Sequence, residues 1–410
     1  MSTSATVVDK HAIEMTDREQ RDAIERAREL AVEFRPFSER SDREGRFPLE
    51  TVALYKDAGF ADLAVPKRYG GQGGDIWTVA QVSRELAKGD SSASLAYNMH
   101  QSMVGIFRGS TALTEDARAR LMRSVVEGRL LLCGPFSEAR AGLSGLADTV
   151  AVPSPDGGWK LTGRKNWATL CEGSDLVSTN ATITDADGNL PDTHEGRLAA
   201  ESTFIFPTRT PGVTVEHTWD TLGMRGSGSD TMVFAEAPVP AEAYAGNFRA
   251  GLLGEAEWAS LLFGAVYLGV AERALEELVP ILRKKHTGMT AASSDTAVKD
   301  SGSVQHELGR ARATVDAAAR AIETSARMVI DGRAPSGDPL ARKAFLDVTK
   351  VATTEAAILA TDIGCRLVGG PAFRRGHVLE RLFRDARAGY NHSFGTRQLY
   401  DALGALALRG

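Results

Sequence analysis

The residue pattern of this 410-residue chain changes twice, and this alternation is the strongest constraint on its fold. Up to about residue 129, apolar residues recur at helical spacing, and a capping-box pair, Thr16 and Glu19, precedes Ile24, Ala27 and Ala31. From about residue 130 the chain consists of short β-prone runs separated by Gly, Pro, Asp and Asn. Long helical runs return after Pro240. The order predicts an α+β protein in three segments.

Chain breakers set the expected element ends in the first segment. Proline lacks the N–H that a helix interior uses, so we expect the first helix to stop at Pro36. A second helix is predicted from about Pro48 to Gly59, where glycine can end it. Residues 65–74 indicate a turn-rich loop, and three further helices are predicted over 77–89, 91–107 and 113–127.

The middle segment has the pattern of an all-β sandwich or small barrel. Its predicted strands cover 130–136, 147–152, 159–164, 175–183, 202–206, 213–219 and 231–237. Asp156-Gly157-Gly158 between two of these runs predicts a hairpin. The polar stretch 184–201 is expected to be an exposed loop.

The third segment predicts long helices over about 255–285, 301–332, 338–368 and 378–387, with a last helix from about 396. Alanine-rich stretches within them suit closely packed antiparallel helices, and 287–303 is expected to be a mobile loop. We therefore expect an N-terminal all-α domain at 1–129, a middle β domain at 130–245 and a C-terminal helical domain at 246–410.

Composition excludes several classes of function. The formal net charge of −5 argues against a nucleic-acid surface, which needs clustered Lys and Arg. The sequence has no secretory signal pattern and no uncharged stretch long enough to cross a bilayer, so we expect a cytoplasmic protein without a membrane segment. The three cysteines and eight histidines lack metal-ligand spacing, and no metal site is predicted.

Common nucleotide motifs are also missing. No Gly-x-Gly-x-x-Gly follows a strand, and the sequence contains neither a P-loop nor a nucleophile elbow. Any cofactor must therefore be held in another way.

Six ordered segments resemble motifs of the acyl-CoA dehydrogenase superfamily, and they span most of the chain. They are Ala64–Gly71, Ser137–Gly142, Gly163–Thr169 closed by Ser174-Asp175, Leu222–Thr231, Gln305 in its Val-Gln-x-x-Leu setting, and the C-terminal stretch from Gly369-Gly370 through Arg384-Asp385-Ala386 to Gly395-Thr396. Each motif is weak alone, but six in the family order form a specific signal. The resemblance implies the family architecture, in which a helical domain, a β-barrel or sandwich domain and a four-helix bundle follow one another.

The resemblance also implies a flavin, FAD in the dehydrogenases and FMN or FAD in related monooxygenases. The ring edges of a flavin need short donors, and its face needs a flat apolar partner. The residues expected to bind the cofactor are Phe136, Ser137, Trp167, Thr169, Arg283, Gln305, Gly369, Gly370 and Thr396. Some would serve a neighbouring subunit, since the family implies a homotetramer or homodimer with shared sites.

The catalytic base of the family is missing from both of its usual positions. Family dehydrogenases remove the α-proton of the substrate with a glutamate just before the Gly-Thr pair, where this chain has Phe394. The alternative position, counted back from Gly269, is Ala259. Two residues remain as candidate catalytic groups: Glu255, one helical turn earlier, and His392, whose imidazole could shuttle a proton.

Two reaction types remain open. The first hypothesis is α,β-dehydrogenation of an acyl thioester, carried by CoA or by a carrier protein, with an external electron acceptor. The alternative is a two-component monooxygenase, in which a separate reductase supplies reduced flavin and the product is oxygenated at nitrogen, sulfur or carbon. A non-catalytic flavoprotein is a third reading. The expected substrate contacts are Ser144, Phe394, Tyr390 and Met99.

Overall fold

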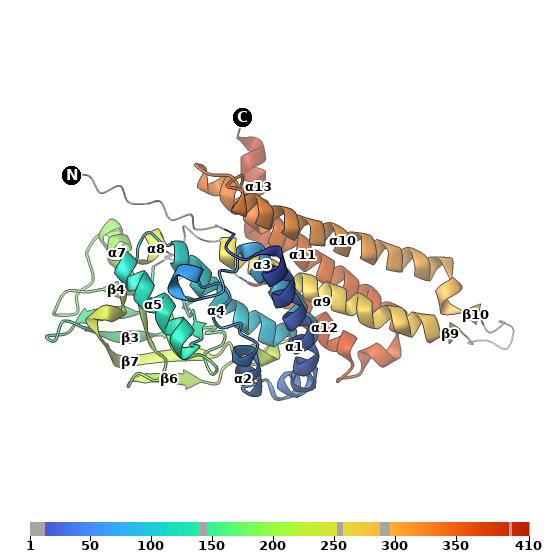
Figure 1. Ribbon diagram of the computed structural model, residues 1–410, viewed down its shortest axis with the longest axis horizontal. Coiled ribbons are helices and arrows are strands. Elements are labelled where there is room, and N and C mark those ends of the chain that lie inside the picture. The colour runs from blue at the N-terminus through green and yellow to red at the C-terminus, as the bar shows by residue number, and fades with distance from the viewer. Residues whose placement is uncertain (1–12, 140–145, 252–256, 288–295, 393–395, 410) are drawn as a thin grey trace.

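The computed structural model describes residues 13–139, 146–251, 257–287, 296–392 and 396–409. Figure 1 shows the β-sheet at one end of the molecule and the long C-terminal helices reaching to the other. The N-terminal helices are α1 (Asp17–Glu44), α2 (Glu50–Asp57), α3 (Ile76–Gly89), α4 (Ser91–Gly109) and α5 (Glu115–Gly128).

Helix α1 confirms one prediction and corrects another. Thr16 and Glu19 form the predicted capping box, each side chain accepting a backbone N–H of the other residue. The expected stop at Pro36 is wrong, because α1 continues through this proline and ends at Gly45, whose positive φ of 67° suits a left-handed cap. Phe34, Ser38 and Ser41 are buried on both sides of Pro36, so tertiary contacts outweigh the lost helical hydrogen bond.

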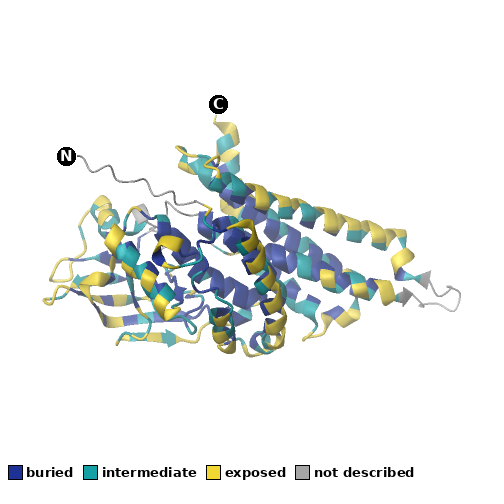
Figure 2. Ribbon diagram, in the orientation of Figure 1, coloured by how far each residue is buried: buried dark blue, intermediate teal, exposed yellow. Residues whose placement is uncertain are grey.

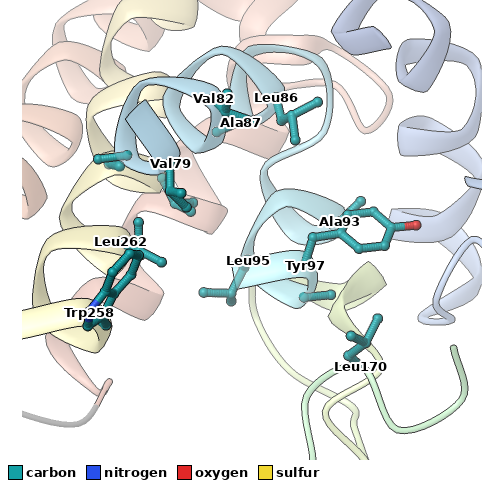
Figure 3. Close-up of a cluster of buried hydrophobic side chains, with 14 of the residues drawn as sticks. Val79, Val82, Leu86, Ala87, Ala93, Leu95, Tyr97, Leu170, Trp258 and Leu262 are labelled. Atoms are coloured by element: carbon teal, nitrogen blue, oxygen red, sulfur yellow. The ribbon is translucent and has the colours of Figure 1, made fainter. Parts of the chain in front are cut away.

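The core lies where α3 and α4 meet α9 (Glu257–Lys284). Figure 3 shows Val79 and Leu86 of α3, Leu95 of α4, and Trp258 and Leu262 of α9 in one buried cluster. The contact between α4 and α9 is close, because a Cβ added at Gly105 would lie 2.1 Å from the Trp258 ring. Glycine at this position lets the two helices approach each other.

The middle segment forms an eight-stranded sheet of β1 (Leu132–Cys133), β2 (Val150–Pro153), β3 (Trp159–Lys165), β4 (Leu176–Ile183), β5 (Glu201–Pro207), β6 (Val213–Glu216), β7 (Thr231–Val239) and β8 (Tyr244–Asn247). The strand order is β6-β7-β3-β2-β4-β5-β8, and β1 pairs with β4. The hairpin at Asp156–Gly158 is confirmed, with Gly157 at φ 89°. The predicted loop 184–201 contains a short helix, α7 (His194–Ala200), capped by Thr193. Strand β8 was not predicted.

After the short helix α8 (Phe248–Gly251), the C-terminal segment contains α9, α10 (Gly302–Ile330), α11 (Pro339–Val368), α12 (Val378–Arg387) and α13 (Thr396–Leu408). A two-stranded ribbon of β9 (His286–Thr287) and β10 (Thr296–Ala297) lies between α9 and α10. Helix α9 is long and apolar enough to cross a membrane by length and composition, but 78% of its apolar window is buried inside the protein. In Figure 2, α9 is largely dark blue, whereas α10 has an exposed outer face.

Candidate active site

A cavity of about 680 Å³ opens where the three segments meet, a volume typical of small-molecule sites. One side, the middle-domain wall, comprises Phe136, Ser137, Trp167, Thr169 and Ser229. The other side, the helical wall, comprises Leu95, Met99, Met103 and Ile106 of α4, Ala259 and Phe263 of α9, and Arg387 and His392 at the C-terminal end. The predicted residues Phe136, Ser137, Trp167, Thr169, Met99 and His392 all lie here.

The middle-domain wall presents an exposed aromatic ring next to hydroxyl groups. Trp167 is 61% exposed, and its φ of 56° is rare for a residue with a bulky side chain. Next to it, the Thr169 and Ser229 hydroxyl oxygens lie 2.8 Å apart, and Ser229 lies 2.7 Å from the Ser227 hydroxyl. The backbone carbonyl of Ser137 accepts the N–H of Asn166 at 2.8 Å. These bonds fix the hydroxyls in position before any ligand binds.

A buried polar network supports this wall from behind. Lys165, at the end of β3, is fully buried and forms an ion pair with Glu138. Lys165 also donates to Asn180 at 2.8 Å, and Asn180 donates to Glu201 at 2.7 Å. Since Glu138 is adjacent to Ser137 and Lys165 lies two residues before Trp167, the network fixes the backbone on which the wall depends.

The Arg-Asp-Ala motif joins the N-terminal and middle segments at the cavity. Asp385 is buried and accepts hydrogen bonds from the Ser91 hydroxyl at 2.5 Å and the Met224 N–H at 2.7 Å. Burial raises the pKa of Asp385 to about 6, against the opposing effect of these bonds. Arg384 makes two hydrogen bonds to Asp42 of α1, at 2.7 and 2.8 Å. The motif is therefore a clamp that holds α12 against both other segments.

The helical wall is mainly apolar, and its chemistry is concentrated at His392. The imidazole of His392 stacks on Phe263 with the ring centres 4.9 Å apart. Its Nδ1 lies 2.7 Å from the hydroxyl of Tyr267. Desolvation, assisted by the positive charge of Lys350, lowers the pKa of His392 to about 3. His392 is therefore a neutral imidazole at physiological pH.

Lys350 holds the turn that leads to this histidine. It is fully buried on α11, and its ammonium group donates to the Gly389 carbonyl at 2.6 Å. Burial lowers the pKa of Lys350 to about 8. Gly389 itself packs against Thr354, where an added Cβ would lie 2.5 Å from the threonine methyl. The turn is thus fixed on two sides.

Arg387 is a cationic residue of the cavity lining. Its guanidinium has no carboxylate within ion-pair distance in the described part of the chain. It donates to the Thr361 hydroxyl at 3.3 Å and to the Phe383 carbonyl, and its guanidinium lies 3.2 Å from the Phe383 ring centre. Burial lowers its pKa. Its remaining N–H groups are available to an electron-rich edge of a ligand.

No carboxylate lines the cavity among the described residues. Ala259, the alternative position for the base of the family, lies in the helical wall with only a methyl group. Glu257 is 0% exposed and forms an ion pair with Arg342 at 2.9 Å instead of lining the cavity. Glu255, Ser144 and Phe394 lie outside the described residues.

Several predicted site residues lie away from the cavity. Arg283 is 20 residues beyond Phe263 on α9, which corresponds to roughly 30 Å along a helix. Gln305 is exposed and donates to the Lys299 carbonyl. Gly369, which is half-buried, caps the end of α11, and the exposed Gly370 begins the short turn that follows. Tyr390 is 41% exposed, and its hydroxyl donates to Glu355 at 3.5 Å. Thr396 starts α13 with a buried hydroxyl that has no partner among the described residues.

Sequence reasoning missed Tyr267, Phe263, Ser229 and Arg387. Ser229 lies within the Leu222–Thr231 motif and Arg387 directly follows the Arg-Asp-Ala motif, so both could have been found from those motifs. Tyr267 and Phe263 lie in an apolar run of α9 that reads as ordinary helix core. Nothing in that run indicates that one hydroxyl meets a histidine 125 residues later.

The residues of the cavity fit a flavin. Trp167 offers an exposed aromatic face for the isoalloxazine, and Ser137, Thr169 and Ser229 offer hydroxyls to its polar edges. These groups come from three places in the sequence, at residues 136–137, 167–169 and 229, and they lie together on the middle-domain wall.

Comparison with known proteins agrees with this fit. Models of the acyl-CoA dehydrogenase N-terminal, middle and C-terminal domains match residues 17–129, 136–237 and 261–397. The putative acyl-CoA dehydrogenase YdbM of Bacillus subtilis is 26% identical, with 91% of this chain and 93% of that protein aligned. L-Evernosamine nitrososynthase of a Micromonospora species is 30% identical over 85% of this chain and 80% of that protein.

Among solved structures, FMN-bound TdsC from Paenibacillus sp. A11-2 superposes with a TM-score of 0.82 at 24% identity, covering 94% of this chain and 97% of that one. That likeness concerns the fold. The three domain matches and the 30%-identical relative show that the chain belongs to the acyl-CoA dehydrogenase superfamily and is a flavoprotein oxidoreductase.

Proposed function

We propose that this protein is the oxygenase component of a two-component flavin monooxygenase, supplied with reduced FMN or FAD by a separate reductase. The observation that carries the proposal is the cavity itself, whose described lining contains no carboxylate and one neutral imidazole. Removal of an α-proton needs a strong enough base within hydrogen-bond reach of the substrate. A neutral imidazole whose pKa is about 3 is a weak base for that task.

The same residues suit oxygenation. A reduced flavin against Trp167 would supply two electrons to dioxygen, so that one oxygen atom enters the substrate and the other leaves as water. The chain's part is to exclude water and to place a hydrogen-bond donor near the oxygen that moves. Leu95, Met99, Met103 and Phe263 form the apolar surface that excludes water.

The helical wall also favours an uncharged, largely apolar substrate or substrate segment. Its α4 residues are apolar apart from Ser102, and none of the α4 or α9 lining residues is charged. The similarity to a nitrososynthase supports oxygenation at a heteroatom, and nitrogen or sulfur is the proposed acceptor.

Cofactor sites shared between copies remain part of the proposal. Arg283, Gln305 and the Gly369-Gly370 turn lie too far along the helical bundle to reach the cavity of their own chain. We infer that they contact the cofactor of a second copy in a homodimer or homotetramer.

Acyl-thioester dehydrogenation is the second candidate, favoured by the similarity to YdbM and by Glu255 just before α9. Anaerobic mixing separates the two reactions. The oxidised holoenzyme is mixed with butyryl-, octanoyl- or palmitoyl-CoA while the visible absorbance of the flavin is followed. The proposed monooxygenase stays yellow with all three. Bleaching that is lost in Glu255→Gln would instead establish dehydrogenation with Glu255 as the base.

A further inference from the structure

Tyr267 of α9 is an unused polar group at the back of the candidate active site. Its side chain is fully buried, and its hydroxyl has one hydrogen-bond partner among the described residues, His392 Nδ1 at 2.7 Å. Burial, together with the charge of Asp385, raises the pKa of Tyr267 well above its ordinary value. The phenol therefore keeps its proton and remains a potential donor.

The direction of this hydrogen bond follows from the need to satisfy a buried donor. A buried hydroxyl without an acceptor is strongly disfavoured. The nearby carboxylate of Asp385 is already engaged by the Ser91 hydroxyl and the Met224 N–H. This leaves Nδ1 of His392 as the acceptor for the Tyr267 proton, so Nδ1 is unprotonated. In a neutral imidazole the ring proton is then on Nε2.

The surroundings of the imidazole keep it neutral. Phe263 of α9 covers one ring face, and the positive charge of Lys350 on α11 opposes protonation. From α12, the cation Arg387 lines the same cavity, and the charge of Asp385 acts on Tyr267. His392 has no carboxylate within ion-pair distance among the described residues that would favour an imidazolium.

We propose that Tyr267 fixes His392 as the Nε2–H tautomer, so that His392 presents a hydrogen-bond donor to the cavity and not a proton acceptor. The catalytic role of this tautomer rests on the proposed oxygenase function, whereas the tautomer itself does not. In an oxygenase, the Nε2–H group can hold an oxygen atom or a substrate oxygen in place while charge develops on it. Tyr267 is then a positioning residue, because it acts only through His392.

The tautomer can be measured without turnover. Protein labelled with 15N-histidine is compared as wild type, His392→Gln and Tyr267→Phe, using proton–nitrogen correlation spectra of the imidazoles between pH 7.5 and 5. The resonances lost in His392→Gln identify His392. We expect a neutral Nε2–H pattern throughout this range in the wild type, and a mixture of the two tautomers in Tyr267→Phe.

Tyr55→Phe is the matched control, because Tyr55 is another buried tyrosine whose ring packs in the N-terminal core. It should leave the His392 pattern unchanged. An Nδ1–H tautomer or an imidazolium in the wild type at pH 7.5 would overturn the proposal, and this result needs no variant to fold. A wild-type pattern that persists in Tyr267→Phe would show that Tyr267 does not fix the tautomer of His392.

Kinetics then test the catalytic meaning separately. With reduced flavin supplied, Tyr267→Phe should divert about tenfold more of the consumed oxygen to hydrogen peroxide, with flavin affinity unchanged. If the tautomer is as proposed but the protein instead desaturates thioesters, the proposed function fails while the assignment of the proton stands. Unchanged coupling in an active oxygenase would overturn the positioning role.

Discussion

The two walls of the cavity are built in opposite ways. The middle-domain wall places the hydroxyls of Thr169 and Ser229 beside the exposed Trp167 ring, on residues fixed by nearby strands and loops. The helical wall is mainly apolar, and its one neutral imidazole, in the bend after Tyr390, is fixed by Tyr267 of α9. The middle-domain wall suits binding of the flavin, and the helical wall suits control of oxygen transfer from the flavin to the substrate. Substitutions in the middle-domain wall should therefore alter flavin affinity. Substitutions in the helical wall should alter how much of the consumed oxygen enters the product.

The largest expected effect is that of His392→Phe on the helical wall. Loss of one preorganised donor typically costs about 100-fold or more in rate. Product formation per reduced flavin should fall by that factor, while the Kd for flavin changes less than about twofold. Product yield and flavin fluorescence titration measure the two quantities. Oxygenation within tenfold of the wild type would show that the two walls do not divide the work in this way.

The second effect is on stability against pH. His392 has a pKa of about 3 in the folded protein, below the ordinary value of 6.5. As the pH falls through 6.5, the unfolded chain binds a proton that the folded chain does not, so stability is present above pH 6.5 and is lost towards pH 3. Between pH 7 and 5 this histidine removes up to about 2 kcal/mol from the free energy of unfolding.

Urea titrations of wild type and His392→Phe at pH 7 and 5 test this effect. His100, fully buried with a pKa of about 4, contributes in the same sense to both proteins and does not distinguish them. The variant should lose less stability on acidification than the wild type. An equal loss of stability in the wild type and the variant would mean that His392 is more exposed to solvent than the helical wall allows.

Trp167→Ala tests the middle-domain wall. An aromatic contact contributes about 1.5 kcal/mol, so the Kd for flavin should rise about tenfold. Because the ring is 61% exposed without cofactor, the stability of the apoprotein should hardly change. Trp167→Phe keeps an aromatic face and serves as the control. Unaltered flavin affinity in the alanine variant would remove Trp167 from the cofactor site.

The smallest expected effect is that of Thr169→Val, which keeps the side-chain shape but removes the hydroxyl. A neutral hydrogen bond contributes about 1 kcal/mol, so flavin should bind about fivefold more weakly. The loss should appear in calorimetric titration, with product yield per bound flavin unchanged. A lower product yield per bound flavin would instead mean that the middle-domain wall also controls the transfer of oxygen to the substrate.

The same difference explains what the sequence could predict. Ser137, Trp167 and Thr169 could be predicted to lie close together because they belong to short local motifs, and the structure brings them to one cavity. The long helices were also predictable, since their apolar spacing extends over seven or more turns. Pro36 shows the limit, because buried neighbours on both sides carry α1 through a residue that normally ends a helix.

The helical wall was only partly predictable for the same physical reason. His392 was a candidate because it lies near the position of a missing glutamate, but its protonation state depends on Tyr267, which is remote in sequence. The distance of Arg283 from the cavity likewise follows from the length of α9, and a motif gives no such information.

The most direct test of the central claim is the origin of the oxygen in the product. A reductase supplies the holoenzyme with reduced flavin in the presence of 18O-labelled dioxygen and an aromatic amine or an aromatic thioether as probe. The masses of the products are then measured by mass spectrometry. A flavin site whose described lining has no carboxylate and has a donor imidazole predicts a product carrying one 18O atom from dioxygen and none from labelled water. An α,β-unsaturated thioester free of new oxygen, formed from octanoyl-CoA by the same preparation, would contradict it.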